Sequence, residues 1–281
     1  MEVRLHDDVD RFAALARPLL DTDPVRHTTA LTALDDLRRT GDRPAVLVTL
    51  HEGPRVCGAA LRTPGRGLLV SALPAWWAGP VDAVLAAADP ELAGVFGPTE
   101  EATAFSAAHV ERTGGTVETV MRLRLFVLVA LCPPGGVRGA ARRVVESDVD
   151  LVAVWGRAFR EEALSGRGTA RDPREAAQPV SRPGHGLMLG MVDGVPVALA
   201  GAGPPVAGMS RVGSVYTPPE FRGRGYGSAV TAAASAWALA AGAREVVLFT
   251  DLANPVSNAI YPRIGYRPVY DALELGLRTE L

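Results

Sequence analysis

Short apolar runs alternate with amphipathic stretches along the chain, and glycine and proline punctuate them. In the second half this pattern predicts strands and helices in turn, an order that is typical of a mixed α/β fold. The expected strands are 142–145, 187–192, 195–200, 211–217 and 245–250, with a final strand pair near 266–277. The expected helices run from an Asp148 cap through Phe159, over 225–241 and over 256–261. Asp193-Gly194, between two of the strands, is a hairpin-turn sequence.

A run of proline and glycine separates two halves of the chain. Cys132-Pro-Pro-Gly-Gly-Val-Arg-Gly follows directly on the apolar run 125–131, and such punctuation is typical of a boundary between domains. At 281 residues the chain is also long enough for two domains. We therefore predict domains over residues 1–131 and 141–281, joined by a linker at 132–140.

The two halves present the same landmarks in the same order. The turn at 52–56 corresponds to the turn at 193–197, each lying between two short apolar runs. The segment 67–74 then corresponds to 213–218. These matches indicate a tandem duplication, and chance similarity between two alanine-rich segments is the alternative.

Composition and charge exclude several classes of partner. The net charge is -2 and no block of like charge occurs, so nothing points to nucleic acid. The two cysteines lie far apart and the five histidines show no ligand spacing, which argues against a metal site and a disulfide framework. A reducing cytoplasm fits best. The charged N-terminus does not resemble a secretory signal, and the uncharged stretch 225–243 is mostly Ala, Gly and Ser, so we expect a buried helix and no membrane partner.

The stretch from Arg222 to Gly227, Arg-Gly-Arg-Gly-Tyr-Gly, is the clearest candidate for a ligand site. Its alternating glycines remove Cβ atoms just ahead of a helix, whose N-terminus carries partial positive charge. Two arginines add full charges, so a pyrophosphate is the expected ligand, and a solvated glycine turn is the alternative. A P-loop is excluded because the chain has no lysine. Ser228 stands where a dinucleotide-binding loop has its third glycine, which disfavours that reading.

This loop and a second segment together resemble the GNAT superfamily of N-acetyltransferases. Arg-x-x-Gly-x-Gly at 222–227, after a strand ending at 215–217, looks like the acetyl-CoA signature of that superfamily. Asn254 followed by Ile-Tyr-Pro-Arg-Ile-Gly-Tyr at 260–266 is similar to its Asn...Leu-Tyr-Glu-Lys-Leu-Gly-Phe segment. The resemblance covers about 141–281. It implies that the first half is a degenerate copy, because no such loop follows its equivalent strand.

The resemblance also implies roles for individual residues. Backbone groups of Val215 and Thr217 would hold the pantetheine arm like an added strand, and Asn254 would bind its amide region. Tyr261 would donate a proton to the leaving thiolate, since a phenol with a pKa of about 10 is protonated at neutral pH. The complete predicted acetyl-CoA set is Val215, Tyr216, Thr217, Arg222, Gly223, Arg224, Gly225, Tyr226, Gly227, Ser228, Asn254, Ser257 and Tyr261.

The group that takes the proton of the amine is not defined by the pattern. Many GNAT relatives carry a carboxylate on the strand before the loop, whereas 209–217 contains none. Glu161 and Glu162, after the first helix of the second half, are the catalytic candidates besides Tyr261. The alternatives are that both are surface residues and that a water chain serves instead.

These observations predict a cytoplasmic α/β protein of two tandem acyl-CoA N-acyltransferase-like domains. It would transfer the acetyl group of acetyl-CoA directly to a primary amine of a small-molecule or peptide acceptor, without a metal. The first domain would either shape the acceptor groove or form a homodimer contact, and the sequence does not decide between them. The rival is a non-enzymatic acyl-CoA-binding or regulatory module, and a nucleotide-binding oxidoreductase is third.

Overall fold

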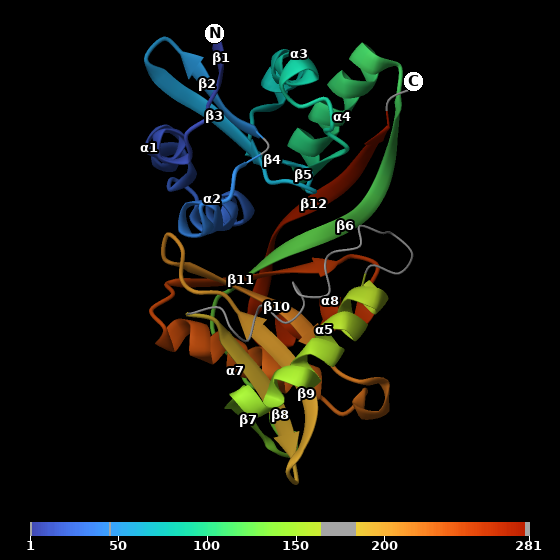
Figure 1. Ribbon diagram of the computed structural model, residues 1–281. Coiled ribbons are helices and arrows are strands. Elements are labelled where there is room, and N and C mark those ends of the chain that lie inside the picture. The colour runs from blue at the N-terminus through green and yellow to red at the C-terminus, as the bar shows by residue number, and fades with distance from the viewer. Residues whose placement is uncertain (1, 45, 164–183, 279–281) are drawn as a thin grey trace. The chain divides into compact units, whose positions relative to one another are not determined.

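The computed structural model describes residues 2–44, 46–163 and 184–278, which form two compact units with mixed α/β structure (Figure 1). The first unit comprises the described parts of Met1–Leu125, Asp251–Ala253 and Val269–Leu281. The second unit comprises those of Phe126–Thr250 and Asn254–Pro268. The mixed α/β class predicted from the sequence is confirmed.

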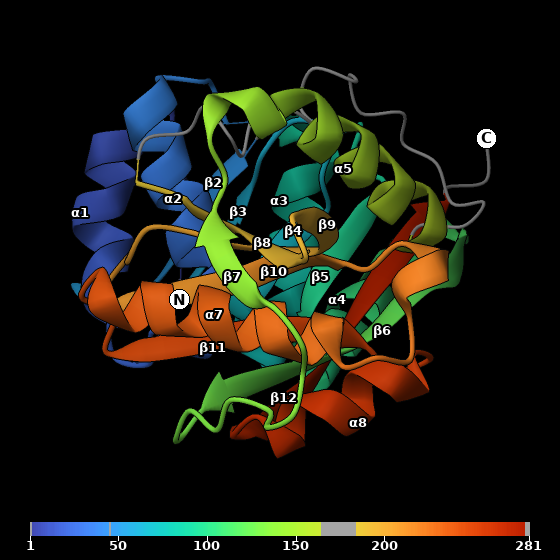
Figure 2. The same cartoon turned by 90° about the horizontal axis from the view of Figure 1, so that it is seen from below.

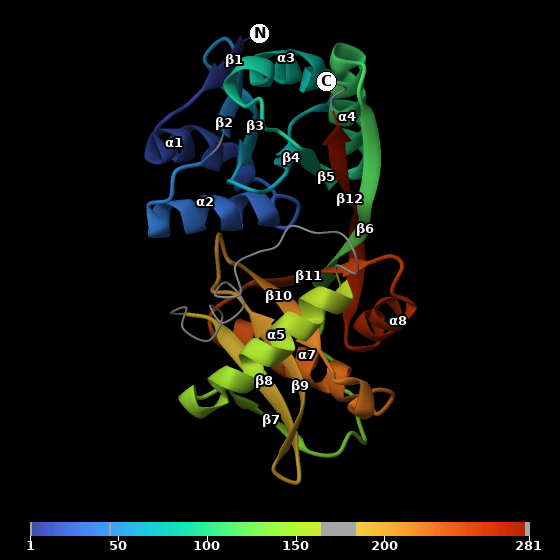
Figure 3. The ribbon, with the colours of Figure 1, turned by 45° about the vertical axis from the view of Figure 1, so that its right-hand side comes forward.

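The sheet of the first unit has the strand order β1-β2-β3-β4-β5-β12. Helices α1 and α2 lie on one face of it, and α3 and α4 lie on the other (Figure 3). The strands are β1 (Glu2–Leu5), β2 (Val46–Glu52), β3 (Arg55–Arg62), β4 (Leu68–Ala72), β5 (Gly94–Pro98) and β6 (Thr116–Leu128). The helices are α1 (Val9–Leu20), α2 (Thr28–Thr40), the 3-10 turn η1 (Ala75–Trp77), α3 (Ala78–Ala88) and α4 (Thr99–Thr113).

The sheet of the second unit has the strand order β7-β8-β9-β10-β11. Its strands are β7 (Ala140–Arg143), β8 (Gly186–Val192), β9 (Val195–Ala202), β10 (Met209–Tyr216), β11 (Glu245–Asp251) and the shared β12 (Tyr266–Arg278). Its helices are η2 (Glu146–Asp148), α5 (Val149–Ala163), η3 (Pro219–Phe221), α7 (Tyr226–Ala240) and α8 (Pro255–Arg263). The predicted hairpin is confirmed, and both turn residues adopt positive φ, 49° at Asp193 and 80° at Gly194.

Along the strands of the second unit, successive apolar side chains alternate between two hydrophobic cores. Leu187, Leu189 and Leu199 pack with α5, whereas Met188, Ala198 and Ala200 pack with α7. Since neighbouring strand residues point to opposite faces, α5 and α7 must lie on opposite sides of the sheet, as Figure 2 shows. Both faces of the sheet are therefore covered by helices. No helix among the described residues is long and apolar enough to span a membrane.

The two halves of the chain repeat the same order of elements. A hairpin (β2-β3 or β8-β9) is followed by a strand, a 3-10 turn, a helix, a parallel strand, a helix and a 13-residue strand. This order is what a tandem duplication predicts. The structural repeats thus agree with the sequence landmarks that suggested them.

The compact units do not follow the predicted boundaries at 131 and 141. Strand β12 ends the second repeat, yet its residues Ala272–Gly276 pair antiparallel with Gly94–Pro98 of β5 in the first unit. Conversely, the end of β6, from Phe126 onward, belongs to the second unit. The last strands of the two repeats therefore cross between the units. Periodicity within a strand does not reveal which sheet edge it joins, so the sequence could not predict this.

Two further expectations need correction. The expected final strand pair is a single strand, β12. Asp271 lies within this strand and forms a bidentate ion pair with Arg124 of β6 at 2.6 and 2.9 Å. The linker at 132–140 belongs to the second unit. At Gly139 (φ 91°) an added Cβ would lie 2.0 Å from the Met191 carbonyl oxygen, so this segment packs directly onto β8.

Asp148 anchors β7 to the start of α5 and supplies a test of the second unit. Its carboxylate accepts two bonds from Arg142, at 2.6 and 2.8 Å, and one from the Val145 backbone N–H at 2.8 Å. Mainly because of the Arg142 bonds, the pKa of Asp148 falls to about 2.

A folded-state pKa below the unfolded value of about 3.9 stabilises the protein above pH 4, and this is lost as pH falls through 2. We expect Asp148→Asn to lower the free energy of unfolding by about 1–2 kcal/mol at pH 7, discounted because Arg142 is partly exposed. Urea unfolding from pH 7 to pH 2 measures this. The difference from wild type should shrink below pH 4, and a pH-independent difference would contradict the assignment.

Candidate active site

The candidate site begins where β10 and β11 stop pairing and separate. The two strands pair in parallel from Met209–Glu245 to Val212–Leu248, and no pairing with β11 follows for the described residues 213–216. On its other side β10 continues along β9, at Gly213 and again at Tyr216. The end of β10 therefore has one neighbouring strand instead of two, which leaves room beside it for an extended ligand.

A bulge in β10 lies at this parting. The register with β9 shifts between Gly213 and Tyr216, and Ser214 adopts a φ of 53°. Positive φ is uncommon for a residue with a Cβ, and bulges bend a strand and re-aim its side chains. Gly213 and Ser214 are exposed. The bulge thus turns β10 away from β11 without breaking the sheet with β9.

The glycine loop follows the end of β10. Gly223 and Gly225 both adopt left-handed backbone conformations, with φ of 75° and 81°, and α7 starts at the next residue, Tyr226. The first N–H groups of an α-helix have no partner within the helix and carry its positive end. Arg222, Gly223, Arg224 and Gly225 are exposed. The loop therefore presents backbone N–H groups and exposed arginines at the start of α7.

Gly227 brings the loop close to the parted strand. A Cβ at Gly227 would lie 3.3 Å from Thr217 Oγ1, closer than most side-chain contacts. The Ser228 hydroxyl donates to the Gly225 carbonyl oxygen at 2.8 Å, so it stabilises the first turn. The start of α7 therefore packs close to Thr217, at the end of the strand segment 215–217.

Arg222 has partners that the sequence did not suggest. Its Nε donates to the Thr217 carbonyl oxygen at 2.9 Å, and its Nη2 donates to Glu162 Oε2 at 2.6 Å. Its guanidinium carbon lies 6.0 Å from the centroid of the Tyr216 ring. The Arg222 side chain therefore connects α5 with the end of β10. It also occupies the Thr217 carbonyl group, which was expected to bind the ligand.

The two candidate carboxylates on α5 differ in their surroundings. Glu162 contacts Arg222 and also accepts a bond from the Tyr216 hydroxyl at 3.4 Å. Tyr216 is buried, and this burial, together with the nearby Glu162 charge, raises the pKa of its phenol. Glu161 is exposed and forms no hydrogen bond or ion pair within the described part of the chain. Only Glu162 is thus brought together with the residues of the loop.

Tyr261 lies in the core between α8 and the sheet and is 5% exposed. Its ring meets Phe126 and Tyr266 edge-on, at 6.1 Å between centroids in each case. Burial raises the pKa of its phenol, and a hydrogen bond with the Ser257 side chain opposes this only partly. The phenol is therefore held in its protonated form at neutral pH.

Asn254 and Ser257 are placed for local roles. Asn254 caps α8, and its Oδ1 accepts the Ser257 backbone N–H at 3.0 Å. Ser257 stands one helical turn before Tyr261 and bonds its phenol. The Asn254 side-chain oxygen is thus engaged in the cap, and the residue is exposed.

Val137 is a neighbour of the site that sequence reasoning missed. A Cβ at Gly225 would lie 2.9 Å from Val137 Cγ2, so this side chain packs against the loop from the segment that was expected to be a linker. The proline and glycine residues around Val137 indicated a domain boundary, so a contact with the loop was not predicted. The glycine at 225 is therefore required both by its φ and by Val137.

The first repeat has strands that correspond to β10 and β11, but no counterpart of the glycine loop at 222–227. β4 and β5 pair only at Leu68–Val95 and Leu69–Phe96 within the described residues. The apolar turn η1 and α3 follow, and Trp77 is buried in the core there.

His109 of α4 is buried in the interior of the first unit. Its Nδ1 bonds the buried carboxylate of Asp82 at 2.8 Å, and Arg112 binds the same carboxylate at 2.5 Å. These interior contacts tie α3 to α4. The first repeat therefore keeps the strand separation but replaces the loop and the phenol with core residues.

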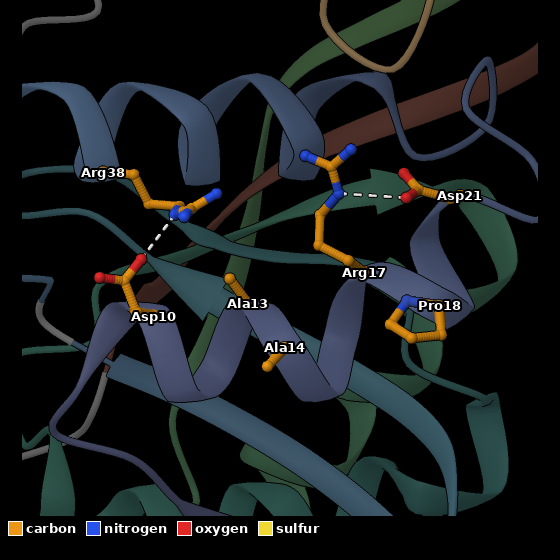
Figure 4. A pocket seen from close by; sticks show the side chains of 7 residues that line it. All are labelled: Asp10, Ala13, Ala14, Arg17, Pro18, Asp21 and Arg38. Carbon is orange, nitrogen blue, oxygen red and sulfur yellow. Dashed lines mark hydrogen bonds and ion pairs between the residues drawn. The ribbon is translucent and has the colours of Figure 1, made fainter.

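A hollow of about 340 Å³ lies elsewhere, along α1 in the first unit. Its charges are paired with one another, Arg38 with Asp10 at 2.7 Å and Arg17 with Asp21 at 3.2 Å (Figure 4). It contains none of the predicted site residues. Within the described residues no group of three or more His, Cys, Asp or Glu side chains could hold a metal ion.

Comparison with known proteins agrees with this geometry. Residues 152–266 match the Acetyltransferase (GNAT) family, and this segment contains the loop, Glu162 and Tyr261. A search of curated protein sequences finds no match.

Solved structures share the fold at low sequence identity. A GCN5-related N-acetyltransferase from Kribbella flavida is 22% identical over 81% of this chain and 88% of its own, with a TM-score of 0.51. An acetyltransferase from the GNAT family from Colwellia psychrerythraea is 11% identical over the whole of both chains, with a TM-score of 0.63. A tandem GNAT protein from the clavulanic acid biosynthesis pathway is 15% identical over 99% and 98%, with a TM-score of 0.55.

Two loop glycines provide a matched test of the loop geometry. Both have positive φ, but an added Cβ meets nothing within 4 Å at Gly223 and meets Val137 at Gly225. We expect Gly223→Ala to lower the free energy of unfolding by about 1 kcal/mol, from backbone strain alone, and Gly225→Ala to lower it more.

Urea unfolding measures both variants. Adding Val137→Ala to Gly225→Ala should recover part of the loss, whereas Val137→Ala added to Gly223→Ala should only destabilise further. Equal losses at the two glycines would show that Val137 does not restrict the loop.

Proposed function

We propose that this chain transfers the acetyl group of acetyl-CoA directly to a primary amine, a proposal supported by the match of residues 152–266 to the Acetyltransferase (GNAT) family. The observation that carries the proposal is the parting of β10 and β11 beside the glycine loop at the start of α7. Tyr261, in the same compact unit, supplies a protonated phenol.

The residues present fit acetyl-CoA. The free side of β10 after Val212 suits an extended pantetheine arm, which the backbone of Val215 and Thr217 would bind as an added strand. Residues Arg222 to Ser228 would bind the pyrophosphate through backbone N–H groups and charge. Acetyl-CoA supplies the activated acetyl group as a thioester. Asn254 would reach it only through its amide nitrogen, since the oxygen caps α8.

Tyr261 acts as the general acid in this proposal. As the amine nitrogen bonds the acetyl carbon, the bond from carbon to sulfur breaks, and the Tyr261 phenol donates its proton to the departing sulfur. Ser257 holds the phenol from one helical turn away. Positioned proton transfer of this kind contributes about 10²- to 10⁴-fold to a rate.

The amine must lose a proton to react, since alkyl ammonium groups have a pKa of about 10. We propose Glu162 as the group that receives it, directly or through water. Glu162 is in contact with the end of β10 through Tyr216 and Arg222, whereas Glu161 is exposed. The first repeat has no equivalent loop or phenol, so the proposal places one reaction site in each chain.

A panel of amines with acetyl-CoA tests the function, with release of free thiol as the readout. Small-molecule monoamines, polyamines, amino acids and peptide N-termini are the acceptor classes to include. Acetyl-CoA binding without thiol release for any of these amines would favour a binding or regulatory module. Competition between NAD(P) and acetyl-CoA would favour the nucleotide-binding reading instead.

Tyr261→Phe isolates the general acid, because it removes one hydroxyl and keeps the ring packing. We expect kcat to fall by about 10²-fold or more, while the Kd of acetyl-CoA measured by calorimetry changes less than about threefold. Tyr270→Phe, in the first unit, is the matched control and should keep the wild-type kcat.

The pH profile of the wild type adds a second readout. Since burial raises the pKa of Tyr261 above 10, its ionisation should cause no fall in kcat below pH 10. Equal kcat values for wild type and Tyr261→Phe would refute the assigned role.

A further inference from the structure

The Arg222 guanidinium lies among three groups that favour a cation. These are the Glu162 carboxylate at 2.6 Å, the Thr217 carbonyl oxygen at 2.9 Å and the face of the Tyr216 ring, 6.0 Å from its centroid. Carboxylates, carbonyl oxygens and aromatic faces all bind ammonium and guanidinium ions. Together they form a subsite that can accept a positive charge from elsewhere.

Buried packing holds the Tyr216 side of the subsite in place. The Tyr216 ring is 7% exposed and packs on Trp155 of α5, 6.1 Å between centroids. The Tyr216 hydroxyl also bonds Glu162 at 3.4 Å. By contrast, the Arg222 and Glu162 side chains are each 47% exposed. The ring and the backbone are therefore fixed, while the guanidinium is the part that can move away.

Arg222 has two competing uses. It occupies the subsite, and it is also the first residue of the loop that would bind the cofactor's pyrophosphate. A pyrophosphate offers a guanidinium more negative charge than one half-exposed carboxylate does, and exposed ion pairs are worth only about 0–1 kcal/mol. Binding of acetyl-CoA would therefore draw Arg222 from Glu162 at little cost.

We propose that Glu162, the Thr217 carbonyl group and the Tyr216 ring form a subsite for a cationic group of the acceptor, which Arg222 fills until acetyl-CoA binds. The part that concerns acetyl-CoA rests on the proposed function. The acceptor is then an amine that carries positive charge, such as a diamine or an amine with a guanidinium group. Acetyl-CoA binds before it.

A matched pair of probes tests the subsite without needing the acceptor. N-Ethylguanidinium resembles the end of an arginine side chain, and N-ethylurea has nearly the same shape without the charge. Removal of the resident guanidinium by Arg222→Ala should lower the Kd of N-ethylguanidinium about tenfold or more relative to wild type, as measured by NMR titration. The Kd of N-ethylurea should be unchanged. Arg222→Gln, which keeps most of the side-chain length, replaces Arg222→Ala if the latter fails to fold.

The neighbouring carboxylates provide the control. In the Arg222→Ala background, Glu162→Gln should abolish the gain in affinity, and Glu161→Gln should keep it. The subsite is overturned if Arg222→Ala and wild type bind N-ethylguanidinium alike, or if Glu161→Gln removes the gain as well as Glu162→Gln does.

Acetyl-CoA separates this proposal from the proposed function. Saturating acetyl-CoA should lower the Kd of N-ethylguanidinium for wild type and should have no such effect on Arg222→Ala. With CoA bound, 1,4-diaminobutane should have a lower Kd than butylamine in NMR titration, and Glu162→Gln should remove that difference. Failure of wild type to bind acetyl-CoA in calorimetry would refute the proposed function, whereas the result with Arg222→Ala alone decides the subsite.

Discussion

The parting of β10 from β11 after Val212 and Leu248 is the constraint on which the site depends. Parallel strands need a crossover between them, and α7 makes it, packing on β8, β9 and β10. The bulge at Ser214 bends β10 away before the crossover begins. The N-terminus of α7, with its glycine loop, therefore comes directly after the end of β10 that β11 does not cover. One backbone feature thus provides both the free strand edge and the anion-binding turn.

Side chains around this backbone are held to different degrees. Tyr261 is packed between Phe126 and Tyr266, and the Tyr266 hydroxyl shares a buried hydrogen bond of 2.6 Å with Ser235 of α7. The protonated phenol is therefore part of the core. Arg222 and Glu162, by contrast, are half exposed. A fixed acid and a movable ion pair are what the proposed acid catalysis and the proposed acceptor subsite respectively require.

The first repeat shows that the fold alone does not carry the chemistry. Its β4 and β5 also part early, but η1 and α3 bury Trp77 where the second repeat exposes glycines. His109 is tied to Asp82 in the interior. Breaking such a buried pair costs several kcal/mol. These polar groups of the first repeat therefore serve its stability, and the proposed acetyl transfer involves the second repeat.

Local patterns in the sequence predicted the parts of the structure that depend on nearby residues. The Asp193-Gly194 hairpin, the loop before α7 and the duplication all follow from turn chemistry and motif order. Contacts between distant segments were missed. The pairing of β12 with the edge of β5, the packing of Val137 on Gly225 and the Arg222–Glu162 pair each join segments 60 or more residues apart. Periodicity carries no signal for such pairings.

Calorimetric titration of the wild-type chain with acetyl-CoA tests the central claim most directly, because its stoichiometry counts the sites in each chain. Only the second repeat has the parted strands, the glycine loop and the phenol together. The account predicts one molecule of acetyl-CoA bound per chain. Two molecules per chain would show that the first repeat also binds the cofactor, and no binding would contradict the assignment of the loop.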